Sequence, residues 1–301
     1  MSTQKELTEF QRGRIVECHL ATTESHGERN LWTYDRDGYN GPDNWELSFP
    51  SCGGANQSPI NIDTSTVQVN QELSPFVFHN FDNPFLSSIL YNTGHTAQLI
   101  LERSDAVQVK GGGLGGTFQF DQLHFHWDST SMTQGSEHTI NGRHYPVEMH
   151  LVAFNEKYPN FTVASLYDDG IAVFAVFVKL PDSRNYLTSL QPIVENFEKI
   201  SIPGSAVKLT SPIYFEDLLP ADITRYFRYQ GSLTTPPCSE VVTWTVFEET
   251  VPVNANELLT FRMLVDVNGN PLQHCHRPVQ PLNDRLIVIP PYDFSQQKNN
   301  F

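Results

Sequence analysis

One short stretch constrains this chain more than any other: residues 122–127, QLHFHW, in which polar and apolar side chains alternate. Such alternation predicts a half-buried β-strand. Because side chains two residues apart on a strand point to the same face, Gln122, His124 and His126 share one face. The three apolar residues between them form the opposite face, which can pack into a core. Two imidazoles on the open face can supply two ligands to one metal ion.

A third metal ligand is expected on residues 148–152, EMHLV, which also alternate. Glu148, His150 and Val152 share a face there, and the stretch lies far enough downstream to form an antiparallel neighbour of the first strand. A single histidine on a strand is more often a hydrogen-bonded surface or core residue, so the metal interpretation depends on the third histidine facing the pair. Three histidines with one long spacer suit a catalytic zinc, which keeps its fourth position open for water.

Composition excludes several classes of function. The chain has 301 residues, 39% of them hydrophobic, which is enough for a sizeable core. No apolar run approaches the roughly 20 residues that a membrane-spanning helix needs, so no membrane span is expected. The formal net charge of −15 argues against nucleic acid and anionic membrane surfaces as partners and is otherwise typical of a solvated surface.

Many short strands, few helices and no repeat period predict one domain built on a large mixed sheet. The expected strands, besides the two described above, are Val67–Val69, Phe76–Phe78, Ser87–Tyr91, Gln98–Leu101, Ile171–Leu180 and Val241–Phe247. Ile171–Leu180 is a continuous apolar run and is therefore expected at the centre of the sheet. Helices are expected near the N-terminus from Thr3, over Asn185–Glu198 and over Asn254–Leu264.

Two further features suggest chemistry without establishing it. Residues 232–237, SLTTPP, form a rigid, hydroxyl-bearing loop, and the Thr234 hydroxyl can orient a metal-bound hydroxide if it passes its own proton to an acceptor such as Glu137. His95 follows a glycine in a turn, and an imidazole pKa near 6.5 suits proton transfer at physiological pH. Taken alone, such a loop and an exposed turn histidine are most often structural.

Together these motifs resemble an α-class carbonic anhydrase of the extracellular, disulfide-bearing type. The resemblance is carried in order by SPINI at 58–62, NTGH at 92–95, HFHW at 124–127, QGSEH at 134–138, EMHLV at 148–152, SLTTPP at 232–237 and RPVQPLN at 277–283. It runs from about Leu31 to Ile289, and the full set is far more specific than any one motif.

The resemblance implies a mainly β (α+β) fold. The expected architecture is a single domain around a large, mostly antiparallel twisted β-sheet with a few surface helices. This catalytic domain would span residues 31–290, between an N-terminal extension at 1–30 and a C-terminal tail at 291–301.

The resemblance also implies a role for each site residue. His124, His126 and His150 match the ligands of Zn²⁺, and Gln122 and Glu148 match the hydrogen-bond partners of the first and third histidine. The remaining matches are the pair Thr234 and Glu137 that orients hydroxide, the proton shuttle His95, Tyr34 in an ordered water network, and the substrate pocket Val152, Val173, Leu233, Val242, Trp244 and Thr235.

The implied reaction is the reversible hydration of CO2 to bicarbonate and a proton. Zinc hydroxide attacks CO2 held against the apolar wall, and a proton leaves through ordered water to His95. Sulfonamides and anions are expected inhibitors. Thr93 and Gln98 depart from the asparagines familiar at the polar wall, and Ala153-Phe154 departs from a common His-Trp. A binding or structural protein that keeps zinc on the same fold is the competing hypothesis, for which the acidic surface is compatible with a mineral or calcium-rich setting.

The cysteines bear on compartment and assembly. Cys52 and Cys238 match the positions at which extracellular members of the family carry a disulfide. Cys18 and Cys275 remain, and they could pair with each other, link two chains into a homodimer, or stay free.

An oxidising, extracellular or periplasmic-type compartment is expected from the matched cysteine positions. Asn160 begins an Asn-Phe-Thr sequon and is a candidate for glycosylation, although such short sequons also arise by chance. Residues 1–30 contain no apolar segment of the kind that a signal peptide has, which sits awkwardly with secretion.

Overall fold

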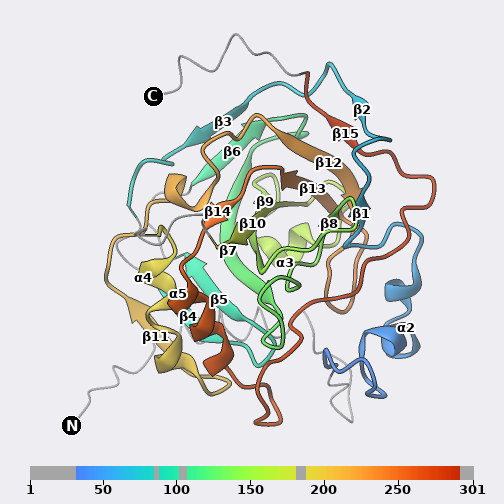
Figure 1. The fold of residues 1–301 in the computed structure, drawn as a ribbon. Helices are drawn as coiled ribbons and strands as arrows, with labels where there is room; N and C mark the ends of the chain where they lie inside the picture. The colour runs from blue at the N-terminus through green and yellow to red at the C-terminus, as the bar shows by residue number, and fades with distance from the viewer. Residues whose placement is uncertain (1–31, 85–87, 102–106, 181–187, 292–301) are drawn as a thin grey trace.

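A computed structural model describes residues 32–84, 88–101, 107–180 and 188–291. The helix expected from Thr3, the N-terminal extension and Cys18 lie outside these residues. Within them the chain forms a large mixed sheet, and strands far apart in the sequence lie side by side at the centre of the molecule (Figure 1). The mainly β fold predicted from the sequence is confirmed.

The order of strands along the main sheet is β11-β4-β5-β7-β9-β10-β13-β12-β15-β2. Most neighbours are antiparallel, whereas β10 runs parallel to both β13 and β14, and β15 runs parallel to β2. The strands are β1 Asn61–Ile62, β2 Gln68–Val69, β3 Phe76–His79, β4 Ser88–Asn92, β5 Ala97–Leu101, β6 Gln108–Gly111, β7 Phe118–Trp127, β8 Thr139–Ile140, β9 Val147–Asn155, β10 Ile171–Lys179, β11 Ala206–Leu209, β12 Tyr226–Gly231, β13 Val242–Phe247, β14 Val251–Pro252 and β15 Val288–Ile289.

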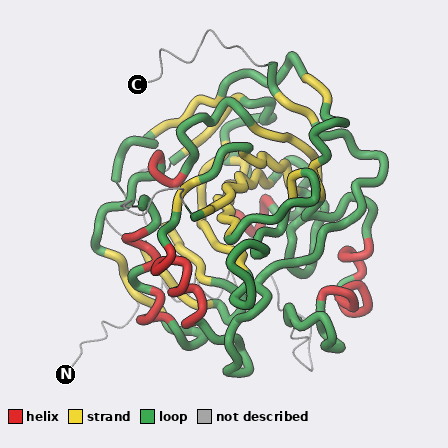
Figure 2. The backbone as a smooth tube through the Cα atoms, viewed as in Figure 1, coloured by secondary structure: helices red, strands yellow, loops and turns green. Residues whose placement is uncertain are grey.

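The described helices are short and lie around the sheet rather than within it (Figure 2). They are η1 Pro42–Asn44, α2 Trp45–Ser48, η2 Pro50–Gly53, α3 Phe161–Ala164, α4 Gln191–Val194, η3 Phe197–Ile200, η4 Glu216–Leu218, α5 Ala255–Thr260 and η5 Phe261–Met263. None of them is long and apolar enough to cross a lipid bilayer.

One helix prediction is confirmed and another is wrong. Asn254 caps α5 through a reciprocal capping box with Glu257, as its place before an apolar periodic run predicts. Over Asn185–Glu198 the described part contains only the single turn α4 and the start of η3. Pro192 lies in the first turn of α4, where a missing N–H is tolerated, so a helix that began upstream at Asn185 could not run through it.

Apolar side chains cover both faces of the sheet. Phe174 and its alternating neighbours on β10 join the larger core beneath the sheet, whereas Val173 and Ala175 join a second core on the opposite face. Every residue from Ile171 to Val178 is therefore buried, which explains the continuous apolar run in the sequence.

A β-bulge interrupts β7 just before the two histidines. Its pairing with β9 shifts between Phe120 and Gln122, which leaves Asp121 as an extra residue. Phe118 and Phe120, at even positions, therefore share the larger core with the odd-numbered apolar residues that follow. The bulge lets one strand keep a continuous apolar face while Gln122 and the histidines stay on the other.

Candidate active site

The pairing of β7 with β9 brings three histidines together. His124 lies directly opposite His150 in the antiparallel register, and His126 lies opposite Glu148. The ring centroid of His150 is 5.2 Å from that of His124 and 4.5 Å from that of His126. Each ring offers a nitrogen to one point, because the three candidate ligand atoms all lie within 4.8 Å of one another.

Hydrogen bonds assign the tautomer of each ring. His124 Nδ1 lies 2.9 Å from Gln122 Oε1, and His126 Nδ1 lies 2.9 Å from the Cys275 carbonyl oxygen. Since both partners are acceptors, these nitrogens carry the protons and the Nε2 lone pairs face inward. In His150 the roles of the two ring nitrogens are reversed. Its Nε2 donates a hydrogen bond to Glu148 Oε1 at 2.7 Å, so the free lone pair is on Nδ1.

The environment keeps these imidazoles neutral. Burial lowers the pKa of His124 and His126 well below the usual value, and repulsion between the rings adds to the effect. The pKa of His150 is lowered by burial as well, although Glu148 opposes the shift. His126 Nε2 is buried without a hydrogen-bond partner among the described residues. A buried lone pair with no partner is costly, and a metal ion at the shared point would engage the lone pairs of all three histidines.

A cleft of about 260 Å³ opens above the histidines. One side is polar and contains Thr93 and Gln98, and the other side is apolar. Of the predicted pocket, the residues that line the cleft are Val152, Val173, Leu233, Thr235 and Trp244. Val242 does not line it: the side chain is fully buried at the start of β13, between Ile171 on β10 and Gly231 on β12.

His95 stands at the mouth of the cleft. The hydroxyl of Thr93 accepts hydrogen bonds from the backbone N–H groups of His95 and Thr96, each at 3.0 Å, which fixes the turn. Gly94 has a φ of +84°, and a Cβ there would meet Val267 at 2.4 Å, so glycine is required. The imidazole stacks on Trp32 with centroids 3.8 Å apart, and it lines both the cleft and a neighbouring hollow.

Glu137 lies fully buried behind the histidines. Its Oε1 accepts the backbone N–H of Arg277 at 2.8 Å and is 3.3 Å from His126 Nδ1. Burial raises the pKa of Glu137 well above its usual value and Glu148 adds to this, whereas the Arg277 N–H and the Thr234 hydroxyl lower it. Thr234 itself is buried and lines the cleft, so its side chain lies between Glu137 and the open space above the histidines.

A buried hydrogen-bond chain joins a histidine to the loop that carries Thr234. Glu148 Oε1 binds both His150 and His138, the latter at 2.6 Å. His138 Nε2 lies 2.7 Å from the Tyr229 hydroxyl, which lies 2.8 Å from Ser58 Oγ. Ser58 in turn holds the loop, since its Oγ accepts the backbone N–H of Ser232.

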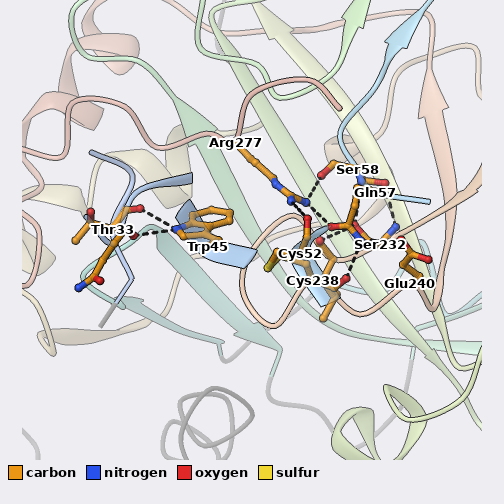
Figure 3. The surroundings of a disulfide bond; sticks show 11 residues. Thr33, Trp45, Cys52, Gln57, Ser58, Ser232, Cys238, Glu240 and Arg277 are labelled. Carbon is orange, nitrogen blue, oxygen red and sulfur yellow. Dashed lines mark hydrogen bonds between the residues drawn. A yellow bond between two sulfur atoms is a disulfide. The ribbon is translucent and has the colours of Figure 1, made fainter. Parts of the chain in front are cut away.

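A disulfide pins the other end of the same loop. Cys52 and Cys238 are joined with a Cα–Cα distance of 4.9 Å across 186 residues of sequence (Figure 3). The buried Arg277 guanidinium donates to the carbonyl oxygens of Cys52 and Ser58 and to Gln57 Oε1. The loop bearing Thr234 is thus held at both ends, by Ser58 and by the bridge.

Loss of the disulfide is expected to destabilise the protein more than it affects chemistry. A Cys52→Ala/Cys238→Ala double variant should lose about 2–5 kcal/mol of unfolding free energy, because the bridge closes a very long loop in the unfolded chain. Chemical denaturation in urea checks this. An unfolding free energy unchanged from that of the parent would contradict it.

The structure leaves Cys275 as a buried free thiol. Its Sγ lies 2.7 Å from the His95 carbonyl oxygen, and burial raises the pKa of the thiol well above its usual value. A bridge from Cys275 to a second chain therefore conflicts with the structure, because such a bridge needs an accessible sulfur. Asn160 is exposed, and its Oδ1 accepts the backbone N–H of Val163 and so caps α3.

Several contacts in the site could not be predicted from the sequence. The Cys275 carbonyl, the Tyr229 hydroxyl and the Arg277 side chain reach the site from distant segments. Only the last lies in a motif that the resemblance singled out, and nothing in its local pattern indicates that it holds the loop. A backbone carbonyl has no sequence signature at all.

Comparisons with known proteins agree with this geometry. Residues 40–290 match the family described as "Eukaryotic-type carbonic anhydrase". The chain is 40% identical to carbonic anhydrase 15 of Mus musculus, over 86% of this chain and 83% of that protein. It is 36% identical to putative carbonic anhydrase 3 of Caenorhabditis elegans, over 85% and 96%. Identity to human carbonic anhydrase 12 is 32%, over 88% and 73%.

Proposed function

Because this chain belongs to the eukaryotic-type carbonic anhydrase family, we propose that it hydrates CO2 with Zn²⁺ held by His124, His126 and His150. The convergence of three inward-facing imidazole lone pairs at the base of a cleft carries this proposal. Zinc bound there would supply a water that ionises near pH 7, a value already known for carbonic anhydrases in general.

The residues around the histidines have distinct roles in this proposal. Gln122, Glu148 and the Cys275 carbonyl hold the ring protons outward and so aim the lone pairs. The Thr234 hydroxyl would accept a hydrogen bond from the reacting oxygen while it donates its own proton to Glu137, and it would thereby orient that oxygen. Val152, Val173, Leu233 and Trp244 offer CO2 an apolar wall from which ordered water is easily displaced.

Proton release is assigned to His95. Its ring reaches both the cleft and the neighbouring hollow, so it can take a proton from ordered water and release it to buffer. Tyr34 lines both spaces, and burial raises the pKa of its hydroxyl well above the usual value. A neutral hydroxyl can order water without competing for the proton.

Replacing His95 should separate proton transfer from CO2 conversion. In His95→Ala, kcat is expected to fall by on the order of 10- to 10²-fold in dilute buffer, while kcat/KM stays near the parent value. Small imidazole buffers should restore kcat. Stopped-flow CO2 hydration measures both, and a kcat insensitive to the substitution and to buffer would remove His95 from the mechanism.

The same assay tests the activity itself. The zinc-loaded protein should hydrate CO2 and be inhibited by sulfonamides, and removal of the metal with a chelator should abolish the rate. No zinc-dependent rate above background would overturn the proposal and favour a binding or structural role on this fold.

The disulfide supports an oxidising, extracellular compartment. Glycosylation at Asn160 fits its exposure and would be detected as a mass shift removed by a glycosidase. A covalent dimer would have to use Cys18, which lies outside the described residues. A single monomer band on gels with and without reductant would exclude that dimer.

A further inference from the structure

A second group of potential metal ligands lies beside the three-histidine site. Asp128 directly follows β7, and an isolated antiparallel bridge pairs it with His274. His276 comes from the same segment, two residues further on. One side-chain ligand atom from each of the three lies within 4.8 Å of the other two.

The distances suit a divalent ion. Asp128 Oδ2 is hydrogen-bonded to His274 Nδ1 at 2.9 Å, and it lies 3.7 Å from His276 Nε2. Two ligand atoms at tetrahedral positions around zinc lie about 3.3 Å apart, given Zn–N and Zn–O bonds of about 2.0–2.2 Å. The two observed values lie on either side of this, and the third separation, between the two histidine nitrogens, is at most 4.8 Å. Side-chain shifts that replace the Asp128–His274 hydrogen bond would bring the three atoms around one ion.

His276 is the observation that points to a ligand. Its side chain is only 6% exposed, and both ring nitrogens are buried without a hydrogen-bond partner among the described residues. The 3.7 Å separation from Asp128 is too long for a hydrogen bond. Native proteins rarely leave a buried imidazole unsatisfied, and an ion at this point would engage Nε2.

Asp128 is held ready for such a role. Its Oδ1 accepts hydrogen bonds from the backbone N–H and the hydroxyl of Thr130, so Oδ2 faces the histidines. An outer hydrogen bond of this kind fixes the orientation of a ligating carboxylate.

An ion can reach the group from solvent. The His274 side chain is 42% exposed and lines a hollow of about 440 Å³, which Asp35 and Asp266 also line. Besides Asp128, the charged or titratable side chains that interact with His276 from other segments are Arg36 and His144. His274 thus connects the group to the hollow, whose wall carries acidic groups that attract a cation.

We propose that Asp128, His274 and His276 form a second divalent-metal site that takes Zn²⁺. Two neutral imidazoles and one carboxylate form a ligand set that zinc prefers over Mg²⁺ or Ca²⁺, which take oxygen ligands. The site is separate from the three-histidine centre, although Cys275 between its two histidines supplies the carbonyl that holds His126.

The test is a zinc titration of the untagged holoprotein. After zinc has filled the first site and excess has been removed, calorimetry with ZnCl2 should detect one further equivalent. His274→Gln and Asp128→Asn should each weaken that binding at least about 10-fold. His79→Gln, at an exposed histidine on β3, is the matched control and should change nothing.

Two further variants separate this site from the first. His150→Ala should lose zinc from the three-histidine centre and still bind one equivalent that His274→Gln then removes. Thermal unfolding of each variant verifies that it is folded, and His274 is exposed enough for its replacement to be tolerated. Absence of a second equivalent, or equal binding by the parent, His274→Gln and Asp128→Asn, would overturn the proposal.

Discussion

The His150→Ala variant is expected to lose the zinc of the three-histidine centre and to lower the rate of CO2 hydration by at least about 10³-fold, because water that is not bound to the metal is scarcely ionised at neutral pH. Alanine removes one of the three candidate ligand nitrogens. It also leaves Glu148 without one of its two histidine partners. Metal analysis after dialysis and stopped-flow hydration measure the two effects.

The control for this variant is His79→Ala. That histidine is exposed on β3, so its removal tests any general effect of losing an imidazole from the surface. Thermal unfolding should accompany both variants, since Glu148 is fully buried and its altered pairing also costs stability. A folded His150→Ala protein with full zinc content and parental activity would refute the assignment of His150 as a ligand.

The Thr234→Val variant should keep its zinc and lose about 10²-fold in kcat/KM. Valine has nearly the shape of threonine but cannot relay a hydrogen bond from the attacking oxygen to Glu137. Removal of one well-placed catalytic hydrogen bond typically costs 10²–10³-fold. The cleft residues that hold CO2 and the three histidines are untouched, so zinc content distinguishes this loss from the loss caused by His150→Ala.

Thr234→Ser is the matched rescue, because it restores the hydroxyl and removes only a methyl group. Its kcat/KM should return to within about 10-fold of the parent value. Equal activity of the valine and serine variants would show that the hydroxyl has no part in the reaction. Thr234 would then act only in packing the loop between Ser232 and Cys238.

Most of the correct predictions about the site came from the alternation of polar and apolar residues with a period of two. It places His124 and His126 on one face of β7 and His150 on one face of β9, and the register of the sheet brings these two faces together. The continuous apolar run of β10 likewise indicated a strand buried on both faces. These predictions succeed because the two-residue repeat of a strand is a local property, which can be recognised in each stretch of sequence separately.

Local patterns failed where distant segments decide the outcome. The bulge at Asp121 changes which residues of β7 face the core. Val242 shares a face with Trp244 yet does not line the cleft, because its side chain is fully buried. None of these follows from a repeat.

The sequence by itself determined the central strands β7, β9 and β10, the face that carries the three histidines and the family. Only the tertiary structure decided that the Cys275 carbonyl orients His126, that Arg277 ties the loop to the disulfide, and that His276 is buried beside Asp128. The physical reason is that burial and hydrogen-bond pairing are properties of segments brought together by folding. Alternation, in contrast, comes from backbone geometry that each strand carries alone.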